Sequence, residues 1–281
     1  MITNNMALFN MRYGDTEAFL RSKVDQLLGQ AEMAAFAQLP SFAELQTALA
    51  ATHLGPAVAD LRVENINKLY NSLAELLAKD IADIEAEAEE GFCRMIELIR
   101  HRYIIDNVFL LLSSAVQARQ DAVKFHPLGE CEQLRTLTNA VDDGVFRAVL
   151  ESTPVSCYFQ EANADLEFFK QIQLKSGDVE QKNQFLNELE ECKQKVFACY
   201  FKHLVQFCKK CGGNTWEAMR KLLTFEADQT TIMLRLNTLG RPMGNRLQEL
   251  YPHFGELYPF TQDNFQNAQD YDSVVNMLND Y

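Results

Sequence analysis

The chain has 281 residues, of which 47% are hydrophobic, so it can bury a sizeable core, and this excludes wholesale disorder. Only 12 glycines and 7 prolines interrupt it, a composition that favours an all-helical fold. The formal net charge of −13 argues against nucleic acid as a partner, because phosphate backbones select Lys and Arg, and suits a basic protein partner better.

No stretch reaches the roughly 18–20 apolar residues that a bilayer span requires, and the first residues lack the basic start and apolar block of a secretory signal. The seven cysteines are odd in number and dispersed, which is typical of free thiols in a reducing compartment. We therefore expect a soluble chain that reaches a membrane only through contacts with a membrane complex.

Helix signals dominate the first half of the chain. Three short helices are expected near the N-terminus, the last of them starting at Ser41, with Glu44 completing a capping box. The sequence HLGPAV at 53–58 predicts a break. Between 61 and about 118, apolar residues spaced by three and four predict two long helices, or one that is kinked near Gly91.

The second half of the chain continues in the same manner, with glycines and prolines marking the connections. Its expected elements are, in order, short helices over 130–152, a polar hinge or insertion over 174–183, a long helix from Phe185 to Gly212–Gly213, a helix over 216–224 capped by Thr215, a helix over 226–239, and two loops around one short helix.

Three segments share apolar offsets of 0, +3, +6, +10 and +13, which place the residues in one stripe along a short helix. They are Leu39, Phe42, Leu45, Leu49 and Thr52; Ala140, Asp143, Phe146, Leu150 and Thr153; and Ala268, Tyr271, Val274, Leu278 and Tyr281. Long helical sequence follows the first two segments, whereas the chain ends after the third. The pattern predicts one all-helical body over 1–281 made of three alike units, at about 8–125, 126–250 and 251–281, with the third incomplete.

A pair of aspartates supports this order of repeats. Asp106, in YIIDNVFLLL, and Asp228, in FEADQTTIML, both precede an apolar helix, a proline turn, a glycine and a short helix. Since a catalytic acid would rarely be duplicated in register, we interpret both as structural groups that anchor a helix. The alternative is that any all-helical chain yields such matches by chance.

Two clusters of polar residues have alternative interpretations. Cys208 and Cys211 form a CxxC motif with His203 upstream, but a fourth zinc ligand and the βαβ context of a thioredoxin site are both missing. We therefore expect no metal or cofactor, and a metal- or thiol-dependent enzyme is the competing hypothesis. The run from Asp80 to Glu90 holds six acids and no base. It indicates the solvated face of a long helix or, alternatively, a docking face for a basic partner.

Four segments carry a family resemblance. YIIDNVFLL, HPLGECEQL, LLTFEADQTTIMLRLNTLG and YPHFGELYP closely resemble segments of subunit d of the eukaryotic V-type proton ATPase, in that family's order and at similar spacings. The start, LFNMRYGDTEAFLRS, looks like that family's start. The likeness runs from about Leu8 to Tyr281, and the corresponding C subunits of archaeal rotary ATPases are more distant relatives. The family's chains run several tens of residues further, and the stretch 174–183 looks longer than usual.

The resemblance implies an all-α, funnel-like body that is a non-catalytic coupling subunit. It would link the central stalk to the proteolipid c ring on the cytoplasmic face of a vacuolar or endosomal membrane, with stalk subunits and c-ring proteolipids as its partners. No catalytic residue, cofactor or metal ligand is implied. The candidate contact residues in the matched segments are Arg12, Tyr13, Tyr251, Phe254 and Tyr258. Packing explains each of them equally well.

The alternative function is a generic helical adaptor that shares only the repeat architecture and binds a basic soluble partner.

Overall fold

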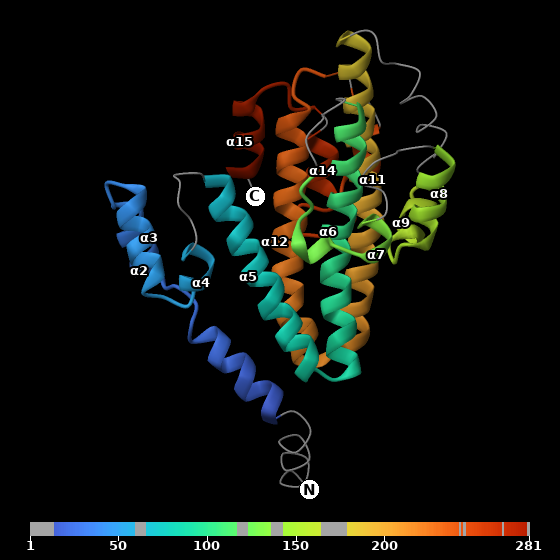
Figure 1. Cartoon of the computed structure of the whole chain (residues 1–281). Helices are drawn as coiled ribbons and strands as arrows, with labels where there is room; N and C mark the ends of the chain where they lie inside the picture. The colour runs from blue at the N-terminus through green and yellow to red at the C-terminus, as the bar shows by residue number, and fades with distance from the viewer. Residues whose placement is uncertain are drawn as a thin grey trace, which may run out of the picture. The chain divides into compact units, whose positions relative to one another are not determined.

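The computed structural model is helical throughout the part of the chain that it describes (Figure 1). The described residues are 14–59, 66–116, 123–135, 143–163, 179–241, 243, 246–265 and 267–279. None of them forms a strand, so the predicted all-α class is confirmed. Within the same ranges, every helix is too short or too polar to cross a bilayer.

The chain divides into two compact units, each of which is described by itself. The first comprises Met1–Tyr103 and Phe125–Glu130, and the second comprises Ile104–Lys124 and Cys131–Tyr281. The division therefore cuts the long helix α6 (Glu90–Val116) between Tyr103 and Ile104. The three units expected from the repeats, and the funnel shape, stay predictions.

The first unit begins with a helix at 14–24, followed by α2 (Gln30–Ala37), α3 (Phe42–Ala50), α4 (Gly55–Val58), α5 (Ile66–Glu87) and the start of α6. The capping residue Ser41 is where the sequence predicts it, with its Oγ accepting a hydrogen bond from the Glu44 N–H at 3.3 Å. Leu49, Val58 and Leu69 form the buried centre of this unit.

Two boundaries in the first unit differ from those predicted. The expected break at 53–58 contains α4, because a proline in the first helical turn gives up no hydrogen bond that the helix would otherwise form. The break between α5 and α6 falls at Ala88–Glu89 rather than at Gly91. The Glu89 carbonyl accepts hydrogen bonds from the N–H groups of Phe92 and Cys93, so α6 begins before the glycine.

The second unit is built on a helical hairpin of α11 (Val179–Cys211) and α12 (Gly213–Asn237), which run antiparallel to each other (Figure 1). Of the apolar residues that the sequence spaces along α11, five are buried, namely Phe185, Leu189, Val196, Tyr200 and Leu204, and Phe207 is half-buried. The helix ends before Gly212–Gly213, as predicted. Of the expected hinge at 174–183, residues 174–178 lie outside the described ranges and 179–183 belong to α11.

The prediction of two helices at 216–224 and 226–239 is wrong, because α12 is continuous. No glycine or proline occurs between Asn214 and Leu239, so nothing in the sequence forces a break near Phe225. Thr215 lies inside the helix, and the N-cap position is held by Gly212.

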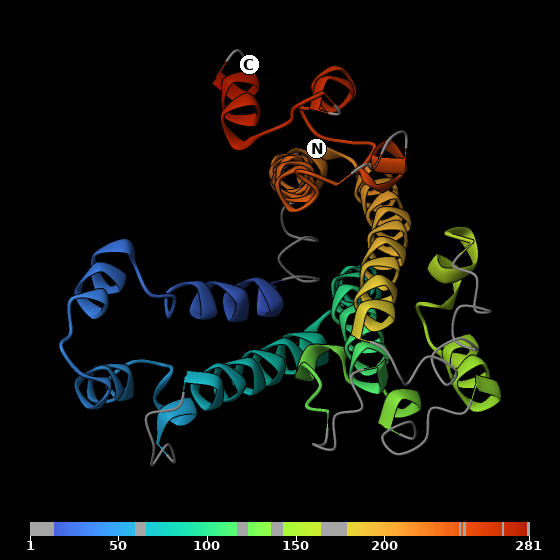
Figure 2. The ribbon, with the colours of Figure 1, turned by 90° about the horizontal axis from the view of Figure 1, so that it is seen from above.

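Short helices surround the hairpin. They are α7 (Glu132–Arg135), α8 (Asp143–Ser152), α9 (Ser156–Glu161), α13 (Arg246–Leu250), α14 (Phe260–Phe265) and α15 (Tyr271–Asn279). Helices α9 and α13 pack against α11, and α15 packs against α12 (Figure 2). A single turn of 3₁₀ type, Pro127–Gly129, belongs to the first unit and contacts α5 there.

The three segments with shared apolar offsets contribute residues to α3, α8 and α15, while Ala140 lies outside the described residues. In the first two, the threonine at the last offset follows the helix in the same way. The Oγ1 atoms of Thr52 and Thr153 donate to the carbonyls of Leu49 and Leu150 respectively, both at 2.7 Å. Tyr281, at the third equivalent position, lies outside the described residues.

Candidate partner interface

The segment Tyr251–Pro259 is a loop that is clamped onto the middle of α12. The Oδ2 atom of Asp228 accepts a hydrogen bond from the Glu256 N–H at 3.2 Å, and its Oδ1 atom accepts one from the Leu257 N–H at 3.0 Å. Gly255 has φ +108°, and a Cβ atom built on it would lie 2.3 Å from Asp228 Oδ1. A glycine at this position is therefore what lets the loop backbone reach the carboxylate.

A buried amide holds both ends of the same loop. Gln262 Nε2 donates to the Pro252 carbonyl and to Thr231 Oγ1, each at 3.0 Å. Leu257 is buried in a core cluster with Phe265, and this packing also fixes the position of the loop. The loop is thus a rigid surface feature whose position follows that of α12.

The three predicted contact residues in this loop differ in exposure. Tyr251 is 1% exposed and packs in a core cluster with Leu247 and Leu250, a location that favours the packing explanation for this residue. Phe254 is half-buried, with its ring 6.2 Å from that of Phe201. Tyr258 is 42% exposed and stacks on the exposed His253 at 5.6 Å.

The other two predicted contact residues, Arg12 and Tyr13, lie outside the described residues. The assignment of all five residues to a partner interface stays a prediction.

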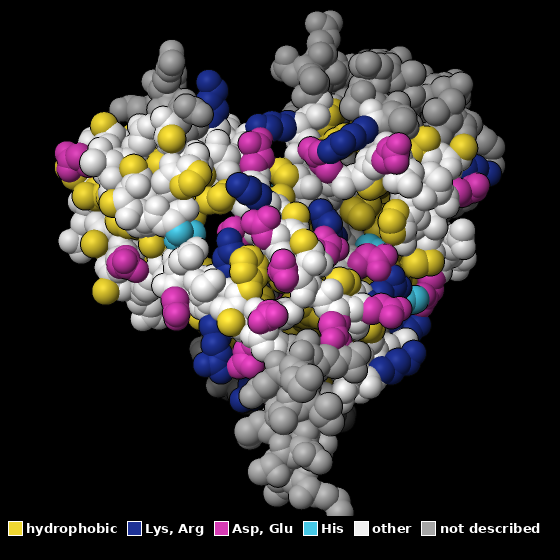
Figure 3. All heavy atoms as spheres, turned by 60° about the horizontal axis from the view of Figure 1, so that its bottom comes forward, with side chains coloured by type: hydrophobic (Ala, Val, Ile, Leu, Met, Phe, Trp, Pro, Cys, Tyr) yellow, Lys and Arg dark blue, Asp and Glu magenta, His cyan; other side chains and the backbone are white. Residues whose placement is uncertain are grey.

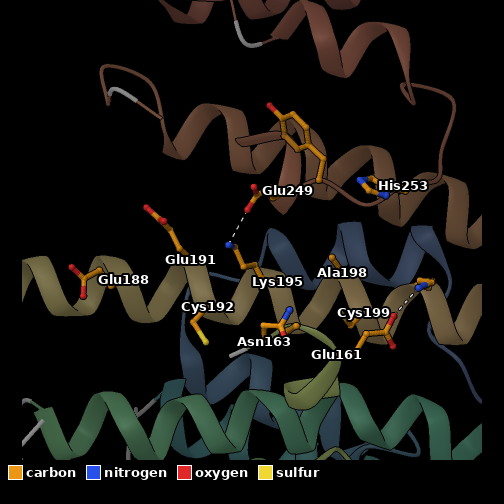
Figure 4. Close-up of a pocket in the computed structure, with 13 residues that line it drawn as sticks. Glu161, Asn163, Glu188, Glu191, Cys192, Lys195, Ala198, Cys199, Glu249 and His253 are labelled. Carbon is orange, nitrogen blue, oxygen red and sulfur yellow. Dashed lines mark hydrogen bonds and ion pairs between the residues drawn. The ribbon is translucent and has the colours of Figure 1, made fainter. Parts of the chain in front are cut away.

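A groove of about 650 Å³ runs along α11, between the end of α9 and the start of the clamped loop (Figure 4). Small side chains, among them Ala198, Cys192 and Cys199, line the groove together with charged residues such as Lys195 and Glu249. Sequence reasoning missed this groove, because its lining comes from three segments whose proximity no local pattern encodes.

Ion pairs link α11 to the neighbouring segments at the groove. Lys195 Nζ on α11 reaches Glu249 on α13 at 3.0 Å, as the dashed line in Figure 4 shows. Glu161, at the end of α9, accepts from Lys202 Nζ and pairs with His203 Nε2, both at 2.7 Å. These two hydrogen bonds lower the pKa of Glu161 below its ordinary value.

The thiols of the groove are not activated for chemistry. Burial raises the pKa of Cys192 from 9.0 to about 11 and also raises the pKa of Cys199. Because the thiolate is the nucleophilic form, a raised pKa disfavours the reactive form of both cysteines near neutral pH.

The competing zinc or thiol site at the end of α11 is not assembled. Cys208 is fully buried and burial raises its pKa, whereas Cys211 is exposed. His203 is engaged with Glu161 on another helix. Across the described ranges, no three His, Cys, Asp or Glu side chains come together as metal ligands would.

The two aspartates that the sequence pairs have different partners. Asp228 holds the loop described above, which agrees with its predicted structural role. Asp106 Oδ1, on α6, pairs with Lys193 Nζ on α11 at 2.7 Å. In the acidic run of the first unit, Asp80 pairs with Lys23 at 2.6 Å and Glu85 pairs with Arg100 at 2.8 Å, so part of that run is used internally.

Comparisons with known proteins agree with the resemblance seen in the motifs. The profile of the family described as ATP synthase (C/AC39) subunit matches residues 16–281. The chain is 28% identical over 279 residues to V-type proton ATPase subunit d2 of Arabidopsis thaliana, which covers 97% of this chain and 75% of that protein. It is 24% identical over 275 residues to V-type proton ATPase subunit d of Saccharomyces cerevisiae, covering 95% and 75%.

Proposed function

This chain belongs to the ATP synthase (C/AC39) subunit family, and from that premise we propose that it is the coupling subunit of a V-type proton ATPase. It connects the central stalk to the proteolipid c ring on the cytoplasmic face of an acidic organelle and performs no chemistry of its own. The observation that supports this proposal is the similarity over nearly the whole chain to proteins named V-type proton ATPase subunit d.

The helical hairpin suits a part that transmits torque. Helix α11 has 33 residues and α12 has 25, so at a rise of about 1.5 Å per residue α11 is roughly 50 Å long. The two helices pack along each other, and close-packed interiors deform little under load. Torque that enters at one end of the hairpin would therefore leave at the other with little loss to bending.

We assign contact with the neighbouring subunits to residues of the loop held by Asp228 and of the matched N-terminal segment. Tyr258 and the outer edge of Phe254 are held by the Asp228 clamp, and Arg12 and Tyr13 belong to the matched N-terminal segment. The net charge of −13 would attract basic surfaces on the stalk or ring and would speed their association.

The test is purification of the tagged chain from detergent-solubilised membranes of its own cells. We expect proteolipids and stalk subunits to co-purify with it, and we expect its depletion to abolish ATP-driven acidification of membrane vesicles. The purified chain alone should hydrolyse no ATP. Recovery of the chain only with a soluble basic protein, with acidification unaffected, would support the adaptor alternative.

A further inference from the structure

The charges of this acidic chain are segregated around the turn between α11 and α12. The segment 202–221 contains five Lys or Arg residues and a single acid, Glu217, within a chain whose formal net charge is −13. Lys202 is paired with Glu161 at the edge of the groove. The remaining four cations are Lys209, Lys210, Arg220 and Lys221, which we call the basic tip.

The backbone brings these four residues to one end of the hairpin. Gly212 alone separates α11 from α12, and both Gly212 (φ +64°) and Gly213 (φ +51°) have the positive φ that such a sharp reversal needs and that glycine adopts readily. A Cβ atom built on either glycine would meet no other heavy atom within 4 Å. The turn therefore projects into open space.

All four cations of the basic tip are exposed and have no carboxylate partner in the described part of the chain. Lys209 Nζ instead lies over aromatic rings, 5.5 Å from the centroid of Trp216 and 5.6 Å from that of Phe254. Figure 3, with the lower end of the molecule brought forward, shows Lys and Arg side chains at the lower left and lower right of the described surface, with Asp and Glu side chains between them.

Apolar groups lie beside the cations. Leu222 is 63% exposed and Phe225 is 70% exposed on the third and fourth turns of α12, and Trp216 is half-exposed on the first. Lysine, arginine and tryptophan next to exposed Leu and Phe are the combination that anchors proteins at the surface of a bilayer.

We propose that the basic tip binds the headgroups of anionic phospholipids and docks the end of the hairpin on a membrane surface. This inference rests on the proposed attachment to a membrane sector. An acidic protein would satisfy the four cations equally well but would not account for the exposed Leu222 and Phe225. The overall charge of −13 does not prevent docking, because repulsion from distant carboxylates is screened beyond about 8–10 Å at physiological salt.

The test measures sedimentation of the purified chain with vesicles of phosphatidylcholine, with and without about 30% phosphatidylserine. Binding should require phosphatidylserine and should be lost when the salt concentration is raised to about 0.5 M. The double variant Lys210→Gln/Lys221→Gln should bind about twenty-five-fold more weakly, since each cation near an anionic surface contributes about fivefold. The matched control is Lys79→Gln/Arg147→Gln, which removes two exposed cations elsewhere and should bind like the parent chain.

Trp216 reports directly on the tip, because it is the single tryptophan of the chain. Its fluorescence should be quenched by brominated lipid in vesicles that contain phosphatidylserine. Binding without quenching, or equal loss of binding in the two double variants, overturns the proposal. A change in Trp216 emission on addition of free inorganic phosphate alone would also overturn it. So would a change in Trp216 emission on addition of an acidic peptide if the chain does not bind vesicles.

Failure of this proposal would leave the coupling function standing, since a chain with no affinity for lipid can still co-purify with the membrane sector and support acidification. Conversely, lipid binding by a chain that never associates with proteolipids would overturn the coupling function alone.

Discussion

The Oδ1 atom of Asp228 accepts a hydrogen bond from the backbone N–H of Leu257, 29 residues further along the chain, at 3.0 Å. The other carboxylate oxygen accepts from Glu256. One side chain on α12 thus determines where the aromatic loop Tyr251–Pro259 lies, and the first two predictions concern this contact.

Replacing Asp228 by alanine should lower the free energy of unfolding by about 2 kcal/mol, since hydrogen bonds to a charged acceptor are lost and the Leu257 N–H is left without a partner. Urea denaturation followed by circular dichroism measures the change. Asp83→Ala is the control, because Asp83 is exposed on α5 and forms no ion pair in the described residues; its effect should stay within about 0.5 kcal/mol. Equal effects of the two substitutions would contradict the anchoring role.

Gly255→Ala should destabilise the chain by about 2–3 kcal/mol, because the residue has φ +108° and the new Cβ atom would overlap Asp228 Oδ1. Part of this cost comes from the overlap alone, so it should shrink when the substitution is made in the Asp228→Ala background. Gly91→Ala provides a contrast, since a Cβ atom there meets nothing within 4 Å inside α6. That substitution should leave stability unchanged or raise it by up to about 1 kcal/mol.

The pairing of Glu161 with Lys202 and His203 should make the second unit sensitive to acid. The pKa of Glu161 is lowered in the folded state, so the pairing stabilises the fold above the ordinary pKa of 4.5 and is lost as the pH falls through the lowered value. Glu161→Gln should flatten the dependence of unfolding free energy on pH in this acidic range. Glu217→Gln, which removes an exposed acid that forms no ion pair in the described residues, should leave the dependence intact. A Glu161→Gln chain that loses stability with acid as steeply as its parent would count against the pairing.

Alkylation should separate the cysteines by exposure. Cys211 and Cys157 are exposed and should react with iodoacetamide first, whereas Cys208 is fully buried. Cys192, with its pKa raised to about 11, should hold roughly a hundredfold less thiolate than an ordinary thiol near neutral pH and should react correspondingly slowly. Peptide mass spectrometry over time gives the individual rates. Rapid labelling of Cys208 together with Cys211 would revive the reactive CxxC hypothesis.

Local sequence patterns predict those parts of this fold that depend on local interactions. The core face of α11, including Phe185 and Tyr200, follows from three- and four-residue spacing, and its end follows from Gly212. The Ser41 cap is another interaction among neighbouring residues. The break expected at Phe225 does not exist, because neither glycine nor proline interrupts the backbone hydrogen bonds of α12 there.

Those local patterns do not predict which residues far apart in the sequence come into contact. Asp106 and Asp228 occupy similar sequence contexts, yet the former pairs with Lys193 on a neighbouring helix while the latter clamps a loop. Ile66 and Leu77 fall on the apolar stripe of α5, but they are 76% and 45% exposed. The groove along α11 likewise depends on where Glu161 and Glu249 lie in space, which spacing along the chain does not encode.

The single residue between α11 and α12 leaves no slack in their connection. A lateral displacement of either helix must therefore displace the other helix at the same time. A longer linker would take up part of each displacement before the second helix moved. The hairpin should therefore transmit a reversal in the direction of turning with little delay.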